Sequence, residues 1–323
     1  MKYEILYALL LGFLLDCLLG DPQGFPHPIV AIGKLIAWLE KALRRLFPRN
    51  KAGELAAGAV LWSLTVAVSF LVPYGLLRLA GRVSPWLHLA LQSVFCWQIL
   101  AARSLQTESM KVYTALKTST LEDARHAVSM IVGRDTQELD VDAVARAAVE
   151  TVAENCSDGV IAPMLFFTLG GGPLAFVYKA VNTMDSMLGY VEPPYKNIGC
   201  VPAKLDDVFN YLPARISAIA MLLAGGLLKL DFQNGLRIFK RDRYNHASPN
   251  SAQTESVCAG LLGLRLAGDA WYHGVLHKKK YIGDALRPIE PEDIKRACRL
   301  MYATTVLMLL LCAAALAVVG MMG

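Results

Sequence analysis

Charged side chains recur at every fourth position near the centre of the chain, at Asp142, Arg146, Glu150 and Glu154. On an α-helix this spacing places them in one stripe, and the other faces carry mainly Val and Ala. A solvated face with acid–base pairs, each contributing about 0.2–0.5 kcal/mol, would explain the stripe equally well. Polar sequence on both sides, from Gly133 to Thr136 and from Asn155 to Pro163, favours a functional site.

A second polar block places Lys179, Asn182, Asp185 and Ser186 at steps that bring them to one helix face. Carboxylate and amide oxygens at this spacing suit a hard cation such as Mg²⁺ bridging to phosphate, and a lysine supplies positive charge for the phosphate itself. The alternative is a structural Lys179–Asp185 pair, because ions buried within a membrane are normally paired.

A third cluster stands at the entrance to an apolar run and comprises Asp206, Asp207, Asn210 and Arg215. The guanidinium group of Arg215 suits bidentate contact with a carboxylate or a phosphate. The alternative is that these residues only mark a membrane interface.

Two shorter polar segments carry weaker signals. His27 lies in a rigid Pro26-His27-Pro28 turn, where it is either a positioned polar group or a part of the turn alone. The segment Ser248 to Ser251, with Glu255 beyond it, predicts a turn followed by an N-capped helix. Neither segment specifies a reaction.

Several familiar sites are missing from the sequence. There is no GxxxxGK[ST], GxGxxG after a strand, HExxH or GxSxG motif, so a nucleotide would have to be held in another way, such as by Mg²⁺ on carboxylates between helices. The seven cysteines form no CxxC pair and no zinc-ligand spacing. We interpret them as small hydrophobic residues.

The elements that must position these residues are apolar helices. Hydrophobic residues make up 55% of the chain, charged residues make up 18%, and the mean hydropathy is +0.40, as is typical of a membrane protein. Runs of suitable length predict spans at 3–19, 55–80, 86–102, 212–230 and 303–319. The run 160–177 contains Gly170 to Pro173 and predicts a broken or re-entrant span.

Between the apolar runs, the polar centre keeps helical periodicity, most clearly over 122–132 and 141–155, and Asp140 is the predicted N-cap of the second helix. No strand-like alternation of useful length and no linker interrupts the chain. The sequence therefore predicts an all-α, polytopic integral membrane protein with a polar helical central region, formed as a single membrane-embedded domain over 1–323.

Basic clusters follow the apolar runs and contribute to a net charge of +5. Such clusters usually flank membranes, and no nucleic-acid recognition motif accompanies them, so we expect a lipid bilayer and no nucleic acid as partner. The cluster from Lys41 to Lys51 favours a cytoplasmic side for 21–51. A single crossing at 212–230 would then export the basic residues from Arg237 to Lys280, which leaves the number of spans and their orientation open.

A series of short sequence blocks, in a specific order, extends along nearly the whole chain. They are Leu15-Asp16, Gly20-Asp21-Pro22, Pro26-His27-Pro28, Val132-Gly133-Arg134-Asp135-Thr136, Arg146 to Asn155, Ser157-Asp158-Gly159-Val160, Ala162-Pro163, Tyr178-Lys179-Ala180, Asn182-Thr183, Asp185-Ser186-Met187, Leu205-Asp206-Asp207, Pro213-Ala214-Arg215 and Ser248-Pro249-Asn250-Ser251. In this order they resemble the cobinamide-phosphate synthase family of cobalamin biosynthesis.

The resemblance implies an ATP- and Mg²⁺-dependent ligase in the cell membrane. Such an enzyme forms an amide between adenosylcobyric acid, a corrinoid, and an amino-alcohol phosphate such as 1-amino-2-propanol phosphate, and it yields adenosylcobinamide phosphate. The carboxylate has to be activated, most simply as an acyl phosphate, before an amine can displace the activating group. Other late enzymes of the corrinoid pathway are the protein partners that the resemblance suggests.

The resemblance also suggests roles for the polar residues. The metal ligands would be Glu150, Glu154, Asp158 and Asp185. The catalytic residues would be Glu150 together with Asp135 or His27 as a base. Substrate or phosphate groups would be bound by Arg134, Arg146, Asn155, Lys179, Asn182, Asp206, Asp207, Asn210, Arg215 and Asn250.

Two other functions fit part of the pattern. An intramembrane, Mg²⁺-dependent prenyltransferase would need paired Asp-x-x-x-Asp motifs on two helices, and only Asp206-Asp207 comes near that pattern. A membrane transporter or sensor would place polar residues on broken helices around a substrate path, and the break from Gly170 to Pro173 is compatible with it.

Overall fold

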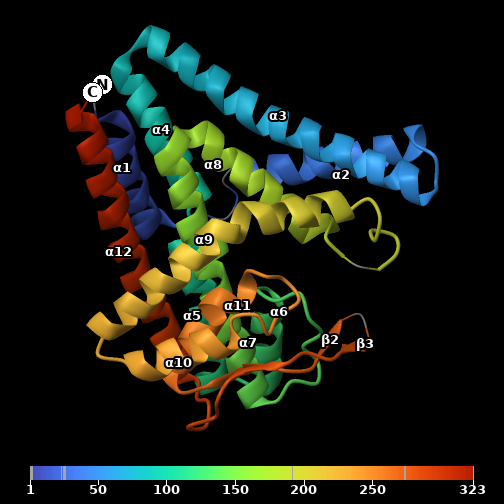
Figure 1. Ribbon diagram of the computed structural model, residues 1–323, viewed down its shortest axis with the longest axis vertical. Coiled ribbons are helices and arrows are strands. Elements are labelled where there is room, and N and C mark those ends of the chain that lie inside the picture. Colours follow the sequence, from blue (N-terminus) through green and yellow to red (C-terminus); the bar gives the residue numbers. More distant parts are fainter. Residues whose placement is uncertain (1–2, 23, 25–26, 191, 273, 323) are drawn as a thin grey trace. The chain divides into compact units, whose positions relative to one another are not determined.

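The computed structural model describes residues 3–22, 24, 27–190, 192–272 and 274–322, and helices dominate them (Figure 1). The helices are α1 (Glu4–Leu19), α2 (Pro28–Leu46), α3 (Lys51–Val83), α4 (Pro85–Ile99), α5 (Ala102–Thr118), α6 (Leu121–Ser129), α7 (Val141–Asn155), α8 (Ala162–Leu188), α9 (Cys200–Leu227), α10 (Phe232–Asp242), α11 (Ser251–Leu262) and α12 (Glu292–Met322). A π-helical turn, η1 (Cys156–Ile161), joins α7 to α8.

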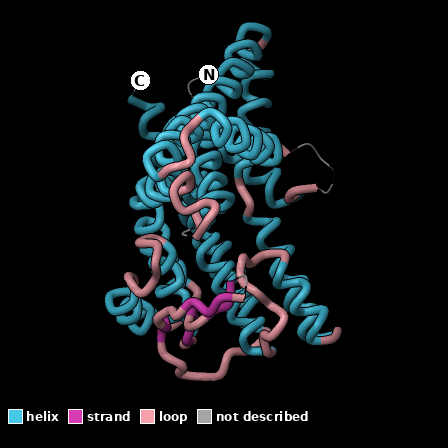
Figure 2. The backbone as a smooth tube through the Cα atoms, turned by 90° about the vertical axis from the view of Figure 1, so that its right-hand side faces the viewer, coloured by secondary structure: helices cyan, strands magenta, loops and turns pink. Residues whose placement is uncertain are grey.

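Among the described residues, four short strands accompany the helices: β1 (Arg265–Ala267), β2 (Ala270–Tyr272), β3 (Val275–His277) and β4 (Tyr281–Gly283). Strand β1 pairs with β4 in antiparallel register, with Leu266 opposite Ile282, and β2 pairs with β3. Figure 2 shows these strands grouped together. Each has only three residues, which is too short to produce the alternation that reveals a strand in a sequence. The predicted all-α fold class is confirmed.

The chain forms two compact units from segments that are distant in the sequence. Unit 1 comprises Met1–Leu100, Ala162–Asn210 and Leu311–Gly323, and unit 2 comprises Ala101–Ile161 and Tyr211–Leu310. Helices α9 and α12 each contribute residues to both units. The single membrane-embedded domain over 1–323 stays a prediction.

Four helical stretches of the described residues are long and apolar enough to cross a membrane: Lys51–Val83, Val141–Leu188, Cys200–Leu227 and Glu292–Met322. They contain the predicted spans 55–80, 160–177 and 303–319 and most of 212–230. The predicted spans 3–19 and 86–102 correspond to α1 and α4, which have 16 and 15 residues. Both are below the roughly 20 residues that a perpendicular span needs. The protein is a multi-pass membrane protein, and its exact number of spans stays a prediction.

Within unit 1, the predicted break in 160–177 lies at Gly170 and Gly171, whose backbone angles are not helical. Gly171 has a φ of 63°, which disfavours any residue with a side chain. A Cβ atom at this position would also collide with the amide of Gln92. The side-chain Oε1 of Gln92 accepts a hydrogen bond of 2.9 Å from the Gly172 N–H. The polar residue of α4 thus satisfies a backbone donor that the break in α8 has released.

Local signals set the start of α7, the helix that carries the charged stripe. The side chain of Asp140 accepts a hydrogen bond of 2.7 Å from the Ala143 N–H, which confirms the predicted N-cap. From Val144 to Ala153, the Val and Ala residues of α7 are buried, as the periodicity predicts. By contrast, Asn250 makes no side-chain capping bond at the start of α11, so the predicted N-cap of that helix is wrong. The helix itself is confirmed, and its described residues are all buried.

Candidate functional site

A cavity of 230 Å³ lies within unit 2 and brings several polar side chains together. The stripe of α7 contributes Glu150, Thr151, Glu154 and Asn155, and α11 contributes Glu255. The remaining lining comes from connecting segments and short strands: Ile131, Val132, Gly133, Arg134, His246, Ala267, Gly268, Tyr272 and Lys279. The cavity therefore unites Arg134, Glu150, Glu154 and Asn155, which the sequence predicted, with residues from the last third of the chain.

Glu150 is held on both carboxylate oxygens. Its Oε2 forms an ion pair with the guanidinium of Arg134, and its Oε1 accepts a hydrogen bond of 2.7 Å from the Ala267 N–H. Burial disfavours the charge of Arg134, but the neighbouring Glu150 carboxylate outweighs it and raises the pKa of Arg134. The pair thus joins the predicted Gly133–Thr136 segment and strand β1 to the middle of α7.

Glu154 and Asn155 lie one turn further along α7. The Glu154 Oε1 accepts a hydrogen bond of 2.7 Å from the Ser251 hydroxyl, at the start of α11. The Asn155 side chain donates to the Thr151 carbonyl at 3.0 Å, within its own helix. Glu154 therefore connects the stripe to α11, which carries the third carboxyl of the cavity.

That third carboxyl belongs to Glu255, for which the sequence predicts only a place in a helix. Glu255 is 5% exposed, and its Oε2 has no hydrogen-bond partner among the described residues. Burial, together with the nearby carboxylates of Glu154 and Glu150, raises the pKa of Glu255 well above the usual glutamate value. No residue pattern around Glu255 indicates this, because α11 has no polar stripe that would single it out.

Lys279 is the second cation of the cavity. Its ammonium donates a hydrogen bond of 2.7 Å to the Tyr272 hydroxyl and lies 4.7 Å from the centre of the same ring. Among the described residues, the Lys279 ammonium forms no ion pair with a carboxylate, and the Lys279 backbone N–H donates to Asp269 at 3.1 Å. The third basic side chain, His246, accepts a hydrogen bond from the Ser248 N–H at 3.1 Å, and burial lowers its pKa.

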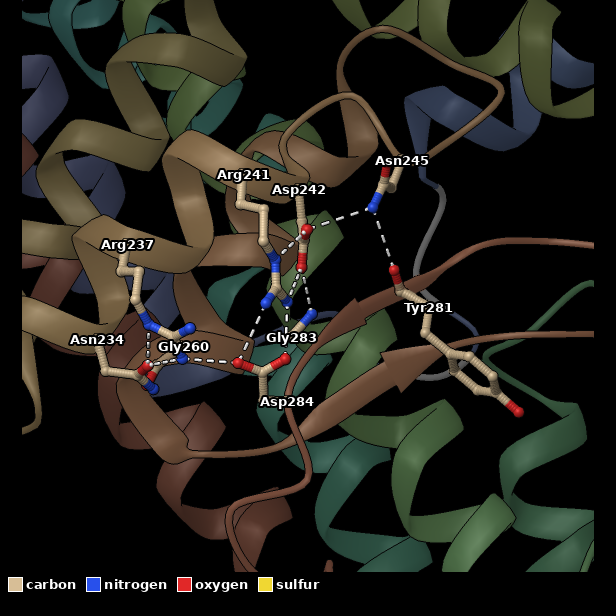
Figure 3. A network of polar contacts seen from close by, with 9 residues as sticks. All are labelled: Asn234, Arg237, Arg241, Asp242, Asn245, Gly260, Tyr281, Gly283 and Asp284. Carbon is tan, nitrogen blue, oxygen red and sulfur yellow. Dashed lines mark hydrogen bonds and ion pairs between the residues drawn. The ribbon is translucent and has the colours of Figure 1, made fainter.

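A polar network fixes the strand that follows Lys279 (Figure 3). Asp242, at the end of α10, accepts a hydrogen bond of 2.7 Å from the Gly283 N–H of β4 and forms an ion pair with Arg241. Asn245 donates to the Tyr281 carbonyl at 3.3 Å, and Asp284 pairs with Arg241 at 2.9 Å. These contacts hold β4 against α10 and so restrict where Lys279 can lie.

We expect the Asp242→Asn variant to lower the thermal midpoint of unfolding in detergent more than Asp284→Asn does. Asp242 is 3% exposed, so losing its charged hydrogen bonds costs roughly 1.5–3 kcal/mol. The Asp284 pairs are more exposed and contribute less than about 1 kcal/mol.

The stabilisation that Asp242 provides should change with pH in a defined direction. Burial opposes ionisation of Asp242, but hydrogen bonds from Arg241 and Gly283 lower its pKa overall. Its stabilisation is therefore present above the ordinary aspartate pKa of about 3.9 and is lost as the pH falls below it. Equal midpoints for Asp242→Asn and Asp284→Asn at pH 7 would contradict this account of the network.

A second polar cluster lies within unit 1. The sequence predicts its residues in two separate polar blocks, each on its own helix. Asp206 of α9 is 8% exposed and accepts a hydrogen bond of 3.0 Å from Asn210, which in turn accepts one of 2.8 Å from the Tyr178 hydroxyl. Asn182 and Asp185 of α8 approach the same carboxylate. The predicted blocks at 179–186 and 206–210 therefore meet.

Two further predicted residues stabilise connecting segments of unit 2. The Asp135 N–H donates to the Trp271 carbonyl at 2.8 Å, and its carboxylate accepts from the Gly274 N–H at 2.8 Å, so Asp135 holds the β2–β3 hairpin. Arg215 lies over the Tyr211 ring, 3.5 Å from its centre, and donates to the Asn250 side chain at 3.2 Å.

The other predicted site residues lie outside the cavity lining. Asp142 is exposed, and Arg146 is half-buried with no hydrogen-bond partner for its Nε among the described residues. Asp158 lies in η1 of unit 2, whereas Lys179 and Asp207 lie in α8 and α9 of unit 1.

The segment at the start of the chain belongs to unit 1. His27 is the N-cap of α2, where its Nδ1 accepts from the Ile29 N–H at 3.3 Å, and its Nε2 lies 3.4 Å from an oxygen of Asp21. Pro26, the first residue of the predicted rigid turn, lies outside the described residues. The structure thus shows a capping role for His27, and its role as a base stays a prediction.

The predicted metal ligands are divided between the units. Glu150, Glu154 and Asp158 belong to unit 2, and Asp185 belongs to unit 1. Over the part of the chain that the structure describes, no three His, Cys, Asp or Glu side chains are grouped so that they alone could hold a metal ion. Mg²⁺, however, usually binds one or two protein carboxylates together with water and substrate phosphates. The buried Asp206 Oδ1 has no hydrogen-bond partner among the described residues, so Asp206 beside Asp185 and Asn182 fits such an ion.

Long apolar helices and a polar, carboxylate-lined cavity define the chain as an all-α, multi-pass membrane protein with a candidate site for charged substrates. It belongs to the CobD/Cbib protein family, whose pattern matches residues 9–301. This membership places the chain in cobalamin biosynthesis.

Curated relatives match the chain over most of their own length. It is 46% identical to a cobalamin biosynthesis protein CobD from Clostridium perfringens, over 88% of this chain and 90% of the relative. It is 46% identical to a cobalamin biosynthesis protein CbiB from Salmonella typhi, over 94% of this chain and 95% of the relative. A CobD protein from Streptococcus sanguinis is 45% identical, over 95% and 96% of the two chains. No solved structure matches the chain significantly.

Proposed function

We propose that the chain is an ATP-dependent acid–amine ligase of the cell membrane. It joins the carboxylate of adenosylcobyric acid to the amine of an amino-alcohol phosphate, such as 1-amino-2-propanol phosphate, and yields adenosylcobinamide phosphate. The observation that carries the proposal is the cavity of unit 2, where Glu150, Glu154 and Glu255 lie with the cations Arg134 and Lys279. Family membership in cobalamin biosynthesis supports the corrinoid substrate.

The reaction requires two transfers. The substrate carboxylate attacks the terminal phosphorus of ATP, forming an acyl phosphate and releasing ADP. The amine then attacks the acyl carbon, and the C–N bond forms as the C–O bond to phosphate breaks, releasing inorganic phosphate and a proton. Cationic side chains stabilise the charge on the phosphate groups, and a carboxylate accepts the proton from the amine.

The residues of the two units suit different parts of this chemistry. In unit 1, Asp185 and Asp206 would hold Mg²⁺, with Lys179 binding phosphate. The ion neutralises phosphate charge when it is bound. In unit 2, Arg134 and Lys279 bind anionic groups, and the ion pair of Arg134 with Glu150 fixes the guanidinium in place. We further propose that the protein works beside other late enzymes of the corrinoid pathway at the membrane.

The test is reconstitution of the purified protein in detergent with adenosylcobyric acid, 1-amino-2-propanol phosphate, ATP and Mg²⁺. We expect a new corrinoid whose mass corresponds to the amide, and one ADP for each amide formed. Chelation with EDTA should stop the reaction, and excess Mg²⁺ should restore it. No amide from a protein with intact helical circular dichroism would overturn the proposal.

A further inference from the structure

The cavity of unit 2 is small for the substrates of the proposed reaction. Its 230 Å³ lies below the roughly 300–1,000 Å³ of pockets that enclose drug-sized ligands. Neither a corrinoid ring nor a nucleotide can be enclosed there, whereas an amino-alcohol phosphate of a few carbon atoms can be. Among the proposed substrates, the size of the cavity therefore selects the amine donor.

The charges of the cavity match both ends of that molecule. Among the described residues, the ammonium of Lys279 hydrogen-bonds only the neutral Tyr272 hydroxyl, so its positive charge is available to a phosphate. The Lys279 backbone N–H donates to Asp269. Glu150 is neutralised by Arg134, and one oxygen of Glu154 is occupied by Ser251. Glu255 keeps an unpartnered buried oxygen, which a primary ammonium group would satisfy.

An amine must lose a proton before it can attack an acyl group. A carboxyl group that is buried beside other carboxylates accepts a proton more readily than an exposed carboxylate does, because burial and like charges favour its neutral form. The pKa of Glu255 is raised for these reasons. The group is therefore protonated over a wider pH range than an ordinary glutamate.

We propose that this cavity is the amine-donor pocket, in which Glu255 binds the primary ammonium group and accepts its proton, while Lys279 binds the phosphate. The proton moves from the ammonium nitrogen to a carboxylate oxygen of Glu255, leaving a neutral amine whose lone pair forms the C–N bond. The pocket would take small zwitterions that carry a primary amine and a phosphate. The assignment rests on the proposed ligase function for the identity of the amine donor and of the reaction.

Binding of the amine donor tests the pocket without any turnover. Isothermal titration of the detergent-solubilised protein with 1-amino-2-propanol phosphate alone, at pH 7, is compared with titration by isopropyl phosphate, which lacks the amine. We expect Glu255→Gln to weaken binding of the amine at least tenfold and to leave isopropyl phosphate unaffected. Lys279→Met should weaken the binding of both compounds. Glu138→Gln, at an exposed position outside the cavity, serves as the control.

Proton release provides a second readout that a purely structural role of Glu255 would not affect. Pairing with an ammonium group favours the ionised form of Glu255, whose pKa is raised by burial and by nearby carboxylates, so binding should release protons. Titrations in two buffers of different ionisation enthalpy measure this release. We expect proton release by the wild-type protein but not by Glu255→Gln. If Glu255→Gln fails to fold, Glu255→Asp takes its place and should still release protons.

The outcomes separate this inference from the proposed function. Unchanged amine affinity in a folded Glu255→Gln variant, or equal proton release by the wild-type protein and by that variant, would overturn the pocket assignment even in an active ligase. Binding with proton release, in a protein that forms no amide, would support the pocket and count against the ligase.

Discussion

Replacing Glu150 by glutamine is expected to reduce amide formation by at least about 100-fold, the size of effect seen when one preorganised charged contact is removed from an active site. Glutamine can still accept the hydrogen bond from the Ala267 N–H, but it cannot neutralise Arg134. A half-buried guanidinium without its counter-charge then binds the wrong group or turns away. The measurement is the initial rate of amide formation, with thermal midpoint and membrane insertion recorded for each variant.

Glu122 provides the matched control for this substitution, because it is an exposed glutamate on α6 outside the cavity. Glu122→Gln should retain the wild-type rate. A Glu150→Gln variant that folds, inserts and turns over at the wild-type rate would show that the Arg134–Glu150 pair is structural only.

Replacing Asp185 by asparagine is expected to abolish turnover at ordinary Mg²⁺ concentrations. Asp185 and Asp206 approach each other on α8 and α9, within apolar stretches where two carboxylates repel strongly unless a cation or a proton lies between them. Removing one charge lowers the affinity for a divalent cation, because Mg²⁺ binding depends on the number of charged oxygen ligands. The Mg²⁺ concentration for half-maximal activity should rise at least about tenfold.

The control for Asp185→Asn is Asp142→Asn, at the exposed start of α7, which should leave the Mg²⁺ dependence unchanged. The readout is a Mg²⁺ titration of the rate at saturating ATP, with insertion into membranes checked in parallel. If Asp185→Asn inserted normally and kept both its rate and its Mg²⁺ dependence, the cluster in unit 1 would have no role in metal binding.

Helix periodicity explains why part of the candidate site could be predicted. Residues four positions apart share a helix face regardless of what packs against it, so Glu150 and Glu154 had to lie together once α7 formed. The same rule failed for Asp142 and Arg146, which belong to the same stripe but do not line the cavity. Periodicity defines a direction around a helix axis, but it does not define how far along the helix a cavity extends.

The break in α8 illustrates a second limit. Glycines and a proline at 170–173 predict an interrupted helix, because they lower helix stability. The partner that satisfies the released backbone, Gln92, is about 80 positions away in the sequence. A polar residue in an apolar run, such as Gln92, indicates by itself only that it needs a buried partner, and it does not indicate which one.

The sequence by itself determined the helical fold class, the long apolar spans, the start of α7 at Asp140 and the faces on which Glu150 and Glu154 lie, because each follows from local composition and spacing. The order of its motifs also determined the family. Only the tertiary structure decided that Glu255 and Lys279, more than 100 residues further along the chain, line the same cavity as that stripe. Helix and strand periodicity are local, whereas a cavity is formed by the packing of distant segments.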